Sequence, residues 1–213
     1  MKTLVIVPVK RFENSKTRLS SILNAGEREQ LAGLMLHDTL ASLAPLSLGI
    51  VVVSPDSRAG EIAGRHGAQF IREEKDSGVN SAVHLADDYC SRAGAEATIV
   101  VPEDLPLLNA LDINEICVMA EKDPFCVVIC PSGRYDGTNI LLRRPPFAIT
   151  TQYDNDSYNR HSKAAKQAGA TLHVARMDRL MFDLDTPSDV ARLVRIKDAT
   201  AKATLKFLSD RVT

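Results

Sequence analysis

The sequence predicts an α/β protein, a three-layer domain in which a mostly parallel sheet carries helices on both faces. Short runs rich in Val, Ile and Leu alternate along the chain with segments of helical periodicity. Strands that are joined through helices pair in parallel, and the helices then cover both faces of a Rossmann-like sheet. The length of 213 residues, with 45% hydrophobic and 25% charged residues, fits a single folded domain, which we expect to span residues 1–213.

The first half of the chain holds four apolar runs, each followed by a helical pattern. The runs are short and mostly β-branched, which is the composition of strands that are buried on both faces. The segments between them carry apolar residues every three or four positions among good helix formers, which indicates amphipathic helices. The expected elements are strand 3–9, helix 27–43, strand 48–53, helix 57–66, strand 68–71, helix 79–93 and strand 97–101.

The second half continues the alternation but contains a segment of different composition. Residues 132–153 are rich in Gly, Arg and Pro, and we expect this segment to fold over one edge of the sheet as an insertion. A long C-terminal helix is expected at 187–210, because Thr186 suits the N-cap, Pro187 the first helical position and Asp189 a capping box. The remaining expected elements are helix 109–121, strand 125–130, strand 138–142, helix 157–168 and strand 171–176.

The balance of charges restricts the partners of the chain. Lys and Arg number 26 against 27 for Asp and Glu, so the net charge is -1. Proteins that coat nucleic acids or bind membrane surfaces need an excess of basic residues, and we therefore expect no nucleic-acid partner and no membrane partner. No apolar run approaches the roughly 20 residues of a membrane span, and no signal-peptide cleavage site follows Met1, so the expected location is cytoplasmic.

A basic segment follows the first strand. Lys10, Arg11, Lys16 and Arg18 lie together at the carboxyl end of this strand, which is where ligands bind in open α/β sheets. Clustered Lys and Arg side chains suit phosphate oxygens, although a solvated basic loop would have the same composition. The segment contains neither the G-x-G-x-x-G pattern of dinucleotide-binding proteins nor a Walker loop. The sequence thus favours a phosphate site of another kind.

Carboxylates occur in two other segments, one after a strand and one before a helix. Glu103 and Asp104 follow the fourth strand in a turn flanked by prolines, and because they are adjacent we expect only one of them to face the crevice. Asp183 and Asp185 precede the C-terminal helix. Alternation along an extended segment puts Asp183 and Asp185 on one side, roughly 7 Å apart, where they suit a divalent cation that also holds phosphate oxygens. The alternative is that both residues only mark a helix start, with Asp185 near its positive end. Together with the basic segment, these carboxylates predict a site for a nucleoside triphosphate and magnesium.

Several motifs occur in a fixed order along the chain. They are VPVK at 7–10, SKTRL at 15–19, VSPD at 53–56, GVNSA at 78–82, PEDLP at 102–106, GTN at 137–139, SYNRH at 157–161 and DLDTP at 183–187. In this order the sequence resembles the 2-phospho-L-lactate guanylyltransferase (CofC) family, which is related to the molybdenum cofactor guanylyltransferases. The resemblance covers residues 4–194 and implies a fold of the nucleotide-diphospho-sugar transferase kind.

The resemblance implies transfer of GMP from GTP to 2-phospho-L-lactate, or to phosphoenolpyruvate in some relatives, with release of pyrophosphate. The product formed from 2-phospho-L-lactate, lactyl-2-diphospho-5'-guanosine, feeds the synthesis of coenzyme F-420. Carried over motif by motif, the implied roles are Lys10, Lys16 and Arg18 on the triphosphate, Gly78 and Asn80 on the nucleoside, Thr138 and Ser157 on the phosphorylated acid, and Asp104, Asp183 and Asp185 on magnesium. The expected catalytic residues are Lys10, Lys16, Arg18 and Asp104.

The implied chemistry depends on positioning and charge neutralisation, because an acceptor phosphate is already ionised near neutral pH. We therefore expect His161 to be structural or to contact the substrate. Two other hypotheses remain open. A metal-dependent glycosyltransferase would carry Asp-x-Asp after a mid-chain strand, and a non-catalytic nucleotide sensor would have lost a carboxylate or a cation. A homodimer is also expected, through packing of the apolar segment 197–208 on a second subunit, and packing on its own sheet is the alternative.

Overall fold

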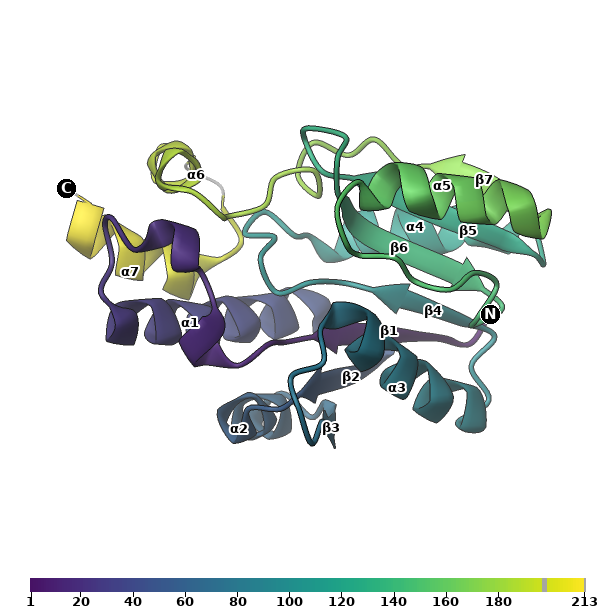
Figure 1. The fold of residues 1–213 in the computed structure, drawn as a ribbon, viewed down its shortest axis with the longest axis horizontal. Coiled ribbons are helices and arrows are strands. Elements are labelled where there is room, and N and C mark those ends of the chain that lie inside the picture. The colour runs from purple at the N-terminus through teal and green to yellow at the C-terminus, as the bar shows by residue number, and fades with distance from the viewer. Residues whose placement is uncertain (197–198, 213) are drawn as a thin grey trace.

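The computed structural model describes residues 1–196 and 199–212. Within these residues seven strands form one sheet in the order β3-β2-β1-β4-β6-β5-β7 (Figure 1). The strands are β1 (Thr3–Pro8), β2 (Gly49–Ser54), β3 (Gln69–Arg72), β4 (Ala97–Val100), β5 (Cys126–Pro131), β6 (Thr138–Arg144) and β7 (Thr171–Val174). The α-helices are α1 (Ala25–Leu43), α2 (Ser57–Arg65), α3 (Val79–Arg92), α4 (Ala110–Glu121), α5 (Ser157–Ala168), α6 (Pro187–Leu193) and α7 (Lys202–Val212).

The pairing of the strands confirms the expected fold class. β1 pairs in parallel with β2 and with β4, so that Val7 lies beside Val52 and Ile6 beside Val100. β3 and β7 extend the sheet in parallel at its two ends, and β6 runs antiparallel to both of its neighbours. Among the described strands, the sheet is therefore parallel except at β6.

Successive residues of β1 face opposite sides of the sheet, and both sides are covered by helices (Figure 1). Val5 and Val7 pack in a core with α1, α2 and α4, whereas Leu4 and Ile6 pack in a core with α3 and α5. This double burial explains why the strand is a continuous apolar run. A third apolar cluster joins Leu19 of the segment after β1 to α1, α6 and α7.

The expectation that residues 132–153 fold over an edge of the sheet is wrong. This segment contributes β6, which lies inside the sheet between β4 and β5. The physical reason is that both faces of β6 are apolar, since Ile140 and Leu142 join one core and Leu141 joins the other. A strand of this kind is covered on both faces only inside the sheet.

The expected C-terminal helix at 187–210 is wrong in its extent. The structure has the two helices α6 and α7 in this region, and residues 197–198 lie outside the described residues. The start of α6 is as expected, because the Thr186 side chain accepts from Asp189 N and the Asp189 side chain accepts from Thr186 N, which is a capping box.

Residues distant in the sequence fix the start of α7. The Asp38 carboxylate of α1 accepts hydrogen bonds from Ala203 N at 3.2 Å and Thr204 N at 2.7 Å, and Ala201 N donates to Pro106 O at 3.1 Å. These bonds satisfy N–H groups that a new helix leaves without internal partners. No local pattern in the sequence indicates them, because the acceptors belong to α1 and to the segment after β4.

The described part of the C-terminal segment packs on its own chain. Ala199, Phe207 and Leu208 are buried in the cluster that also contains residues of α1 and α6. These side chains have apolar partners without a second subunit, and the homodimer stays a prediction. No helix in the described residues is both long enough and apolar enough to span a membrane.

A buried ion pair joins α3 to β6. Arg143 donates from Nη1 to Asp87 Oδ2 at 2.6 Å and from Nη2 to Asp87 Oδ1 at 2.8 Å, and neither side chain is more than 2% exposed. Thr98 Oγ1 on β4 donates to Asp87 and accepts from Arg143. Because either charge alone would be buried without a partner, this network holds the antiparallel strand and α3 in one arrangement.

We predict that Asp87→Ala lowers the free energy of unfolding by about 3–5 kcal/mol, because the Arg143 guanidinium stays buried without its counter-charge. Urea unfolding followed by circular dichroism measures the change. The matched control is Asp88→Ala, since the Asp88 side chain is 46% exposed, and it should change stability by less than about 0.5 kcal/mol. Equal losses in the two variants would contradict the role of the ion pair.

Candidate active site

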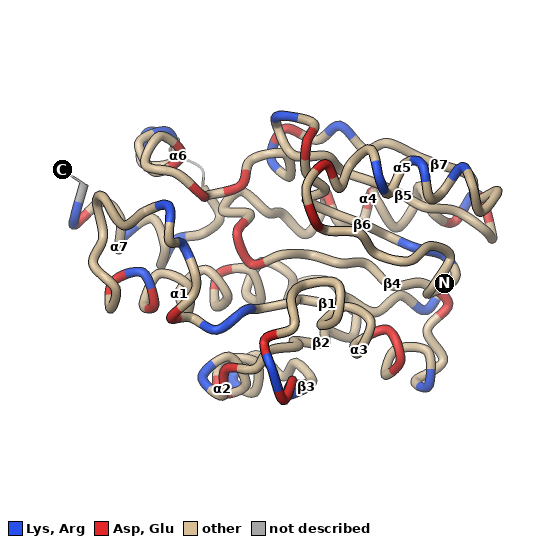
Figure 2. The backbone as a smooth tube through the Cα atoms, in the orientation of Figure 1, with Lys and Arg blue, Asp and Glu red and all other residues tan. Residues whose placement is uncertain are grey.

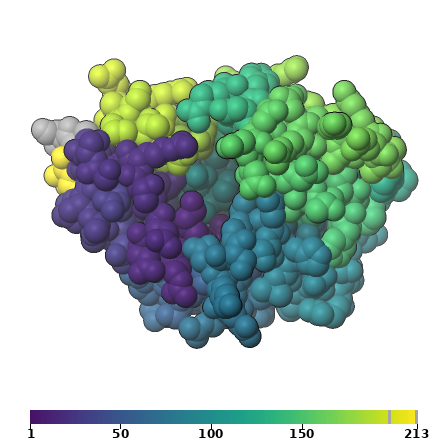
Figure 3. Space-filling view, viewed as in Figure 1, coloured from purple at the N-terminus to yellow at the C-terminus, as the bar shows by residue number. Residues whose placement is uncertain are grey.

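Charged segments meet near the carboxyl ends of β1 and β4. In Figure 2 the basic segment after β1 lies near the acidic segments that follow β4 and precede α6. Figure 3 shows a hollow in this face, bordered by the purple N-terminal segment, the blue-green α3 region and the green α5 region. This is the place where open α/β sheets bind their ligands.

Lys16 is the centre of this arrangement. Its Nζ atom donates to Asp104 Oδ2 at 3.1 Å, to the backbone oxygen of Leu184 at 2.8 Å and to Asp185 Oδ1 at 3.0 Å. The Lys16 side chain is only 5% exposed, so these three oxygens take the place of water around the ammonium. One side chain therefore joins three segments that are far apart in the sequence.

The charges of this cluster shift one another's pKa values. Burial by itself lowers the pKa of Lys16, but the carboxylates of Asp104 and Asp185 outweigh it and raise the pKa well above its ordinary value. Burial likewise tends to raise the pKa of Asp185, but the Lys16 ammonium outweighs it and lowers the pKa. In contrast, burial and the charges of Asp104 and Asp185 raise the pKa of Asp183. Negative charge is therefore concentrated beside Asp183.

Two cavities of about 520 Å³ each meet at this cluster. The residues that line both are Pro8, Val79, Pro102, Asp104 and Asp185. The first, called here the Lys10 cavity, is also lined by Val9, Lys10, Lys16, Glu73 and Gly78. The second, called here the Thr138 cavity, is also lined by Arg18, Thr138, Asn139, Ser157 and Asp183. Nine of the ten predicted site residues thus line one or both cavities.

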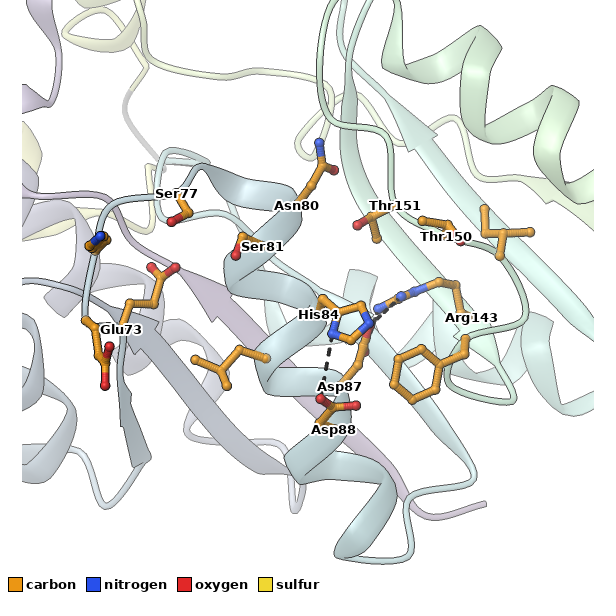
Figure 4. Close-up of a pocket in the computed structure, with 15 residues that line it drawn as sticks. Glu73, Ser77, Asn80, Ser81, His84, Asp87, Asp88, Arg143, Thr150 and Thr151 are labelled. Atoms are coloured by element: carbon orange, nitrogen blue, oxygen red, sulfur yellow. Dashed lines mark hydrogen bonds and ion pairs between the residues drawn. The ribbon is translucent and has the colours of Figure 1, made fainter.

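Arg18 and Asn80 do not line the Lys10 cavity, where the other residues predicted to contact GTP lie. Arg18 lies on the Thr138 cavity, is 65% exposed and places Nη1 3.5 Å from Asp185 Oδ2. Asn80 lines a third cavity on the other side of α3, shown in Figure 4. Its Oδ1 atom accepts a hydrogen bond from Tyr153 N at 2.8 Å, so Asn80 holds the segment that leads to α5 in place. Its contact with the nucleoside stays a prediction.

A hydrogen-bonded network forms the wall of the Thr138 cavity. Thr138 N donates to Ser157 Oγ at 2.8 Å, and Gln152 N donates to His161 Nε2 at 2.8 Å. His161 Nε2 is therefore unprotonated, and His161 Nδ1–H donates to Thr138 Oγ1 at 3.0 Å. Burial, aided by the charge of Arg143, lowers the pKa of His161 to about 4, so the ring is neutral near pH 7. His161 is thus a structural support of this wall.

Comparison with known proteins identifies the family of the chain. The sequence profile described as "Guanylyl transferase CofC like" matches residues 3–212. The chain belongs to this family. The phosphoenolpyruvate guanylyltransferase of Rubrobacter xylanophilus is 36% identical over 198 residues, which cover 91% of this chain and 94% of that protein. The 2-phospho-L-lactate guanylyltransferase of Methanothermobacter thermautotrophicus is 32% identical over 194 residues, covering 91% and 85% respectively.

Solved structures share the fold of this guanylyl transferase family member at lower identity. A putative nucleotide-diphospho-sugar transferase from Desulfovibrio desulfuricans has a TM-score of 0.76 and 16% identity, covering 99% of this chain and 98% of that chain. Molybdopterin-guanine dinucleotide biosynthesis protein A from Archaeoglobus fulgidus has a TM-score of 0.53 and 14% identity, covering 98% and 99%. The family resemblance and the expected fold are both confirmed.

The carboxylates have the donor chemistry of a magnesium site. Asp104, Asp183 and Asp185 line one cavity and supply the hard oxygen ligands that magnesium prefers. Within the described residues, no three His, Cys, Asp or Glu side chains surround one point closely enough to hold a metal ion. Lys16 Nζ contacts both Asp104 and Asp185, so a cation bound by these two carboxylates would compete with the ammonium.

Sequence reasoning missed three residues of the site. Glu73 follows β3 directly, and inspection of the carboxyl end of this strand would have found it. The backbone oxygen of Leu184 accepts a hydrogen bond from Lys16 Nζ, and a backbone contact of this kind does not depend on the type of side chain. Asn139 donates from Nδ2 to Leu180 O at 2.8 Å and holds the segment before α6 against β6. The last two depend on contacts between distant segments.

Asp56 anchors the basic segment from the end of β2. It accepts hydrogen bonds from Phe12 N at 3.1 Å and from Arg58 N at 3.0 Å, and the second bond caps α2. Hydrogen bonds from the Arg58 side chain outweigh the effect of burial and lower the pKa of Asp56 to about 2. Phe12 is buried on one side of Lys16 and Leu19 on the other, so the segment that carries Lys16 is held at both ends.

We predict that Asp56→Ala lowers the free energy of unfolding by about 1–2 kcal/mol at neutral pH, the typical cost of a lost N-cap. The folded pKa lies below the ordinary value of 3.8, so the carboxylate stabilises the fold above about pH 4 and the contribution is lost as the pH falls toward about 2. The difference from wild type in urea unfolding should therefore shrink over this range. A constant difference would contradict the assignment.

Proposed function

We propose that this chain transfers GMP from GTP to 2-phospho-L-lactate or phosphoenolpyruvate and releases pyrophosphate. The observation that carries the proposal is the pair of cavities with Asp104 and Asp185 in their common wall. A nucleotide in the Lys10 cavity and a phosphorylated acid in the Thr138 cavity would bring their phosphates together there. Family relatives named as guanylyltransferases for these two acids support the choice of reaction.

The Lys10 cavity has the features of a triphosphate site. Lys10 and Lys16 supply positive charge at the end of β1. Gly78 is the N-cap of α3 and has a φ of 87°, a conformation that favours glycine. Among the described residues, chain neighbours aside, no atom lies within 4 Å of the position that a Cβ would take. A ligand therefore has close access to the backbone at the start of a 14-residue helix, where N–H groups attract phosphate oxygens.

The Thr138 cavity has donors for a small phosphorylated acid. Thr138 Oγ1 accepts from His161 and Ser157 Oγ accepts from Thr138 N, so each hydroxyl keeps its own proton to donate to a ligand oxygen. Arg18 adds an exposed guanidinium on the same cavity. These groups would hold the acceptor so that one of its phosphate oxygens points to the common wall.

The proposed reaction is a single in-line displacement. An oxygen of the acceptor phosphate forms a bond with the α-phosphorus of GTP, the bond from that phosphorus to the β-phosphate bridging oxygen breaks, and its electron pair leaves with pyrophosphate. The acceptor oxygen is already ionised, so no proton has to be removed. His161 is neutral and both of its ring nitrogens are hydrogen-bonded, which agrees with a reaction that uses no histidine base.

We propose Asp104, Asp183 and Asp185 as the residues that would hold magnesium. When bound, this ion supplies positive charge between the reacting phosphates. Lys16 would exchange its carboxylate partners for phosphate oxygens, which suit an ammonium equally well. The charge that the two carboxylates now share with Lys16 would then be available to the ion.

The alternatives are less well supported. A glycosyltransferase would carry its Asp-x-Asp pair after a mid-chain strand, whereas Asp183 and Asp185 precede α6. A non-catalytic sensor would have lost one of the predicted cations or carboxylates. In this chain all of them are present, and they line the same two cavities. With 2-phospho-L-lactate the product would be lactyl-2-diphospho-5'-guanosine, so we place the protein in coenzyme F-420 synthesis in the cytoplasm.

Pyrophosphate release tests the proposed function. The protein is mixed with GTP, magnesium and either 2-phospho-L-lactate or phosphoenolpyruvate, and pyrophosphate is measured with a coupled enzyme. We expect release with at least one acid and none without an acceptor, and the larger kcat/KM identifies the preferred acid. Absence of release with both acids would overturn the proposal.

We predict that Asp104→Asn lowers kcat at least 100-fold, a typical loss when one group that stabilises transition-state charge is removed. The fold should remain, because Lys16 keeps Leu184 O and Asp185 as partners. The control is Asp154→Asn, since Asp154 lines the Thr138 cavity with a side chain that is 72% exposed, and its kcat should stay within about twofold of wild type. Near-normal turnover of Asp104→Asn would remove this residue from the reacting centre.

A further inference from the structure

Glu73 is a buried carboxylate at the end of the Lys10 cavity. It follows β3, and its N–H donates to Ser54 O at 3.0 Å, which continues the pairing of β2 with β3. Only 6% of the residue is exposed. Glu73 lines both the Lys10 cavity and the third cavity, where Figure 4 shows it at the end opposite Arg143.

The Glu73 carboxylate has no hydrogen-bond donor among the described residues. Among the described residues, neither a hydrogen-bond donor nor a cation contacts it, and the neighbouring charge that acts on it is that of Asp76. Two other buried carboxylates have partners within the fold, Arg143 for Asp87 and Arg58 for Asp56. Glu73 lines two cavities, and its oxygens are not among the fully buried polar atoms of the described residues that lack a partner. The carboxylate is therefore accessible to a ligand that supplies hydrogen-bond donors.

Both lysines of the Lys10 cavity lie at one end of it. Lys10 and Lys16 lie at the end formed by β1, whereas Glu73 follows β3, and β2 separates these two strands. Neighbouring strands lie about 5 Å apart, so the backbone at the end of β3 is about 10 Å from the end of β1 across the sheet. Apolar lining from Val9, Val79 and Ala82 completes the cavity. Asp104, Asp185 and Glu103 also line the cavity and act on Lys16, whereas Glu73 lies two strands away beside Asp76. A nucleotide with its phosphates on the lysines would extend its base along the apolar lining toward Glu73.

We propose that Glu73 selects the base of the nucleotide by accepting hydrogen bonds from N1–H and the 2-amino group of guanine. This inference rests on the proposed function, in which GTP occupies the Lys10 cavity, and it names the residue that distinguishes GTP from other nucleotides. Glu73 acts on binding of the substrate and takes no part in the displacement.

The chemistry of the bases explains the selectivity. Guanine presents two adjacent N–H donors on its Watson–Crick edge, and an ionised carboxylate has two acceptor oxygens and no donor. Adenine and cytosine each present one amino donor beside an unprotonated ring nitrogen, and uracil presents one N–H between two carbonyl oxygens. These three bases would place an acceptor against the carboxylate and leave buried groups unpaired, which costs much more than a missing apolar contact.

Equilibrium binding without an acceptor acid tests the inference. GTP, ITP and ATP are titrated in the presence of magnesium into wild type and Glu73→Gln, and heat or fluorescence gives each Kd. ITP is informative because its base keeps N1–H but lacks the 2-amino group. We expect wild type to bind GTP at least about tenfold more tightly than ITP or ATP, and the preference to fall toward unity in Glu73→Gln because hydrogen bonds to a charged group are lost.

The matched control is Glu74→Gln, since Glu74 is exposed and lines only the third cavity; its preference for GTP should equal that of wild type. Folding of Glu73→Gln is checked by urea unfolding, and its midpoint should stay close to that of wild type because no hydrogen bond or ion pair of the Glu73 side chain within the described residues is lost. An unchanged GTP preference in Glu73→Gln would overturn this inference alone. Failure of wild type to bind GTP would overturn the proposed function as well.

Discussion

The candidate site depends on one buried ammonium. Lys16 Nζ contacts Asp104, Leu184 O and Asp185, so the segments after β1, after β4 and before α6 are held together by the charge of a single side chain. A lysine with 5% exposure is stable only where oxygens replace its water shell. The same contacts form the boundary between the two cavities, because Asp104 and Asp185 line both.

The buried charges of the protein fall into two groups with different consequences. Asp87 and Arg143 satisfy each other inside the fold and thereby position β6. Lys16 and its carboxylates also satisfy each other, but at the edge of two cavities where we propose phosphates and a cation as their alternative partners. Glu73 has no donor in the described residues, so its partner is expected among ligands. The balance of burial against pairing thus separates structural charges from those for which we propose a role in binding.

Much of the fold could be predicted because its strands are buried on both faces and therefore appear as apolar runs. The helix expected at 157–168 has the same bounds as α5, Ser157–Ala168. The two errors have a common cause. The place of β6 depends on helices that cover both of its faces, and the start of α7 depends on the Asp38 carboxylate of α1. Neither contact is encoded in a local pattern.

The sequence by itself determined the alternation of strands and helices, the residue types at the strand ends and the family, because these depend on periodicity and on motifs read along the chain. Only the tertiary structure decided which charges are paired. It placed Lys16 between two carboxylates, turned Asn80 toward Tyr153 N and, within the part of the chain that the structure describes, left Glu73 without a donor. The physical reason is that pairing and burial are properties of segments brought together by folding, and the partners of these side chains lie up to 169 residues away.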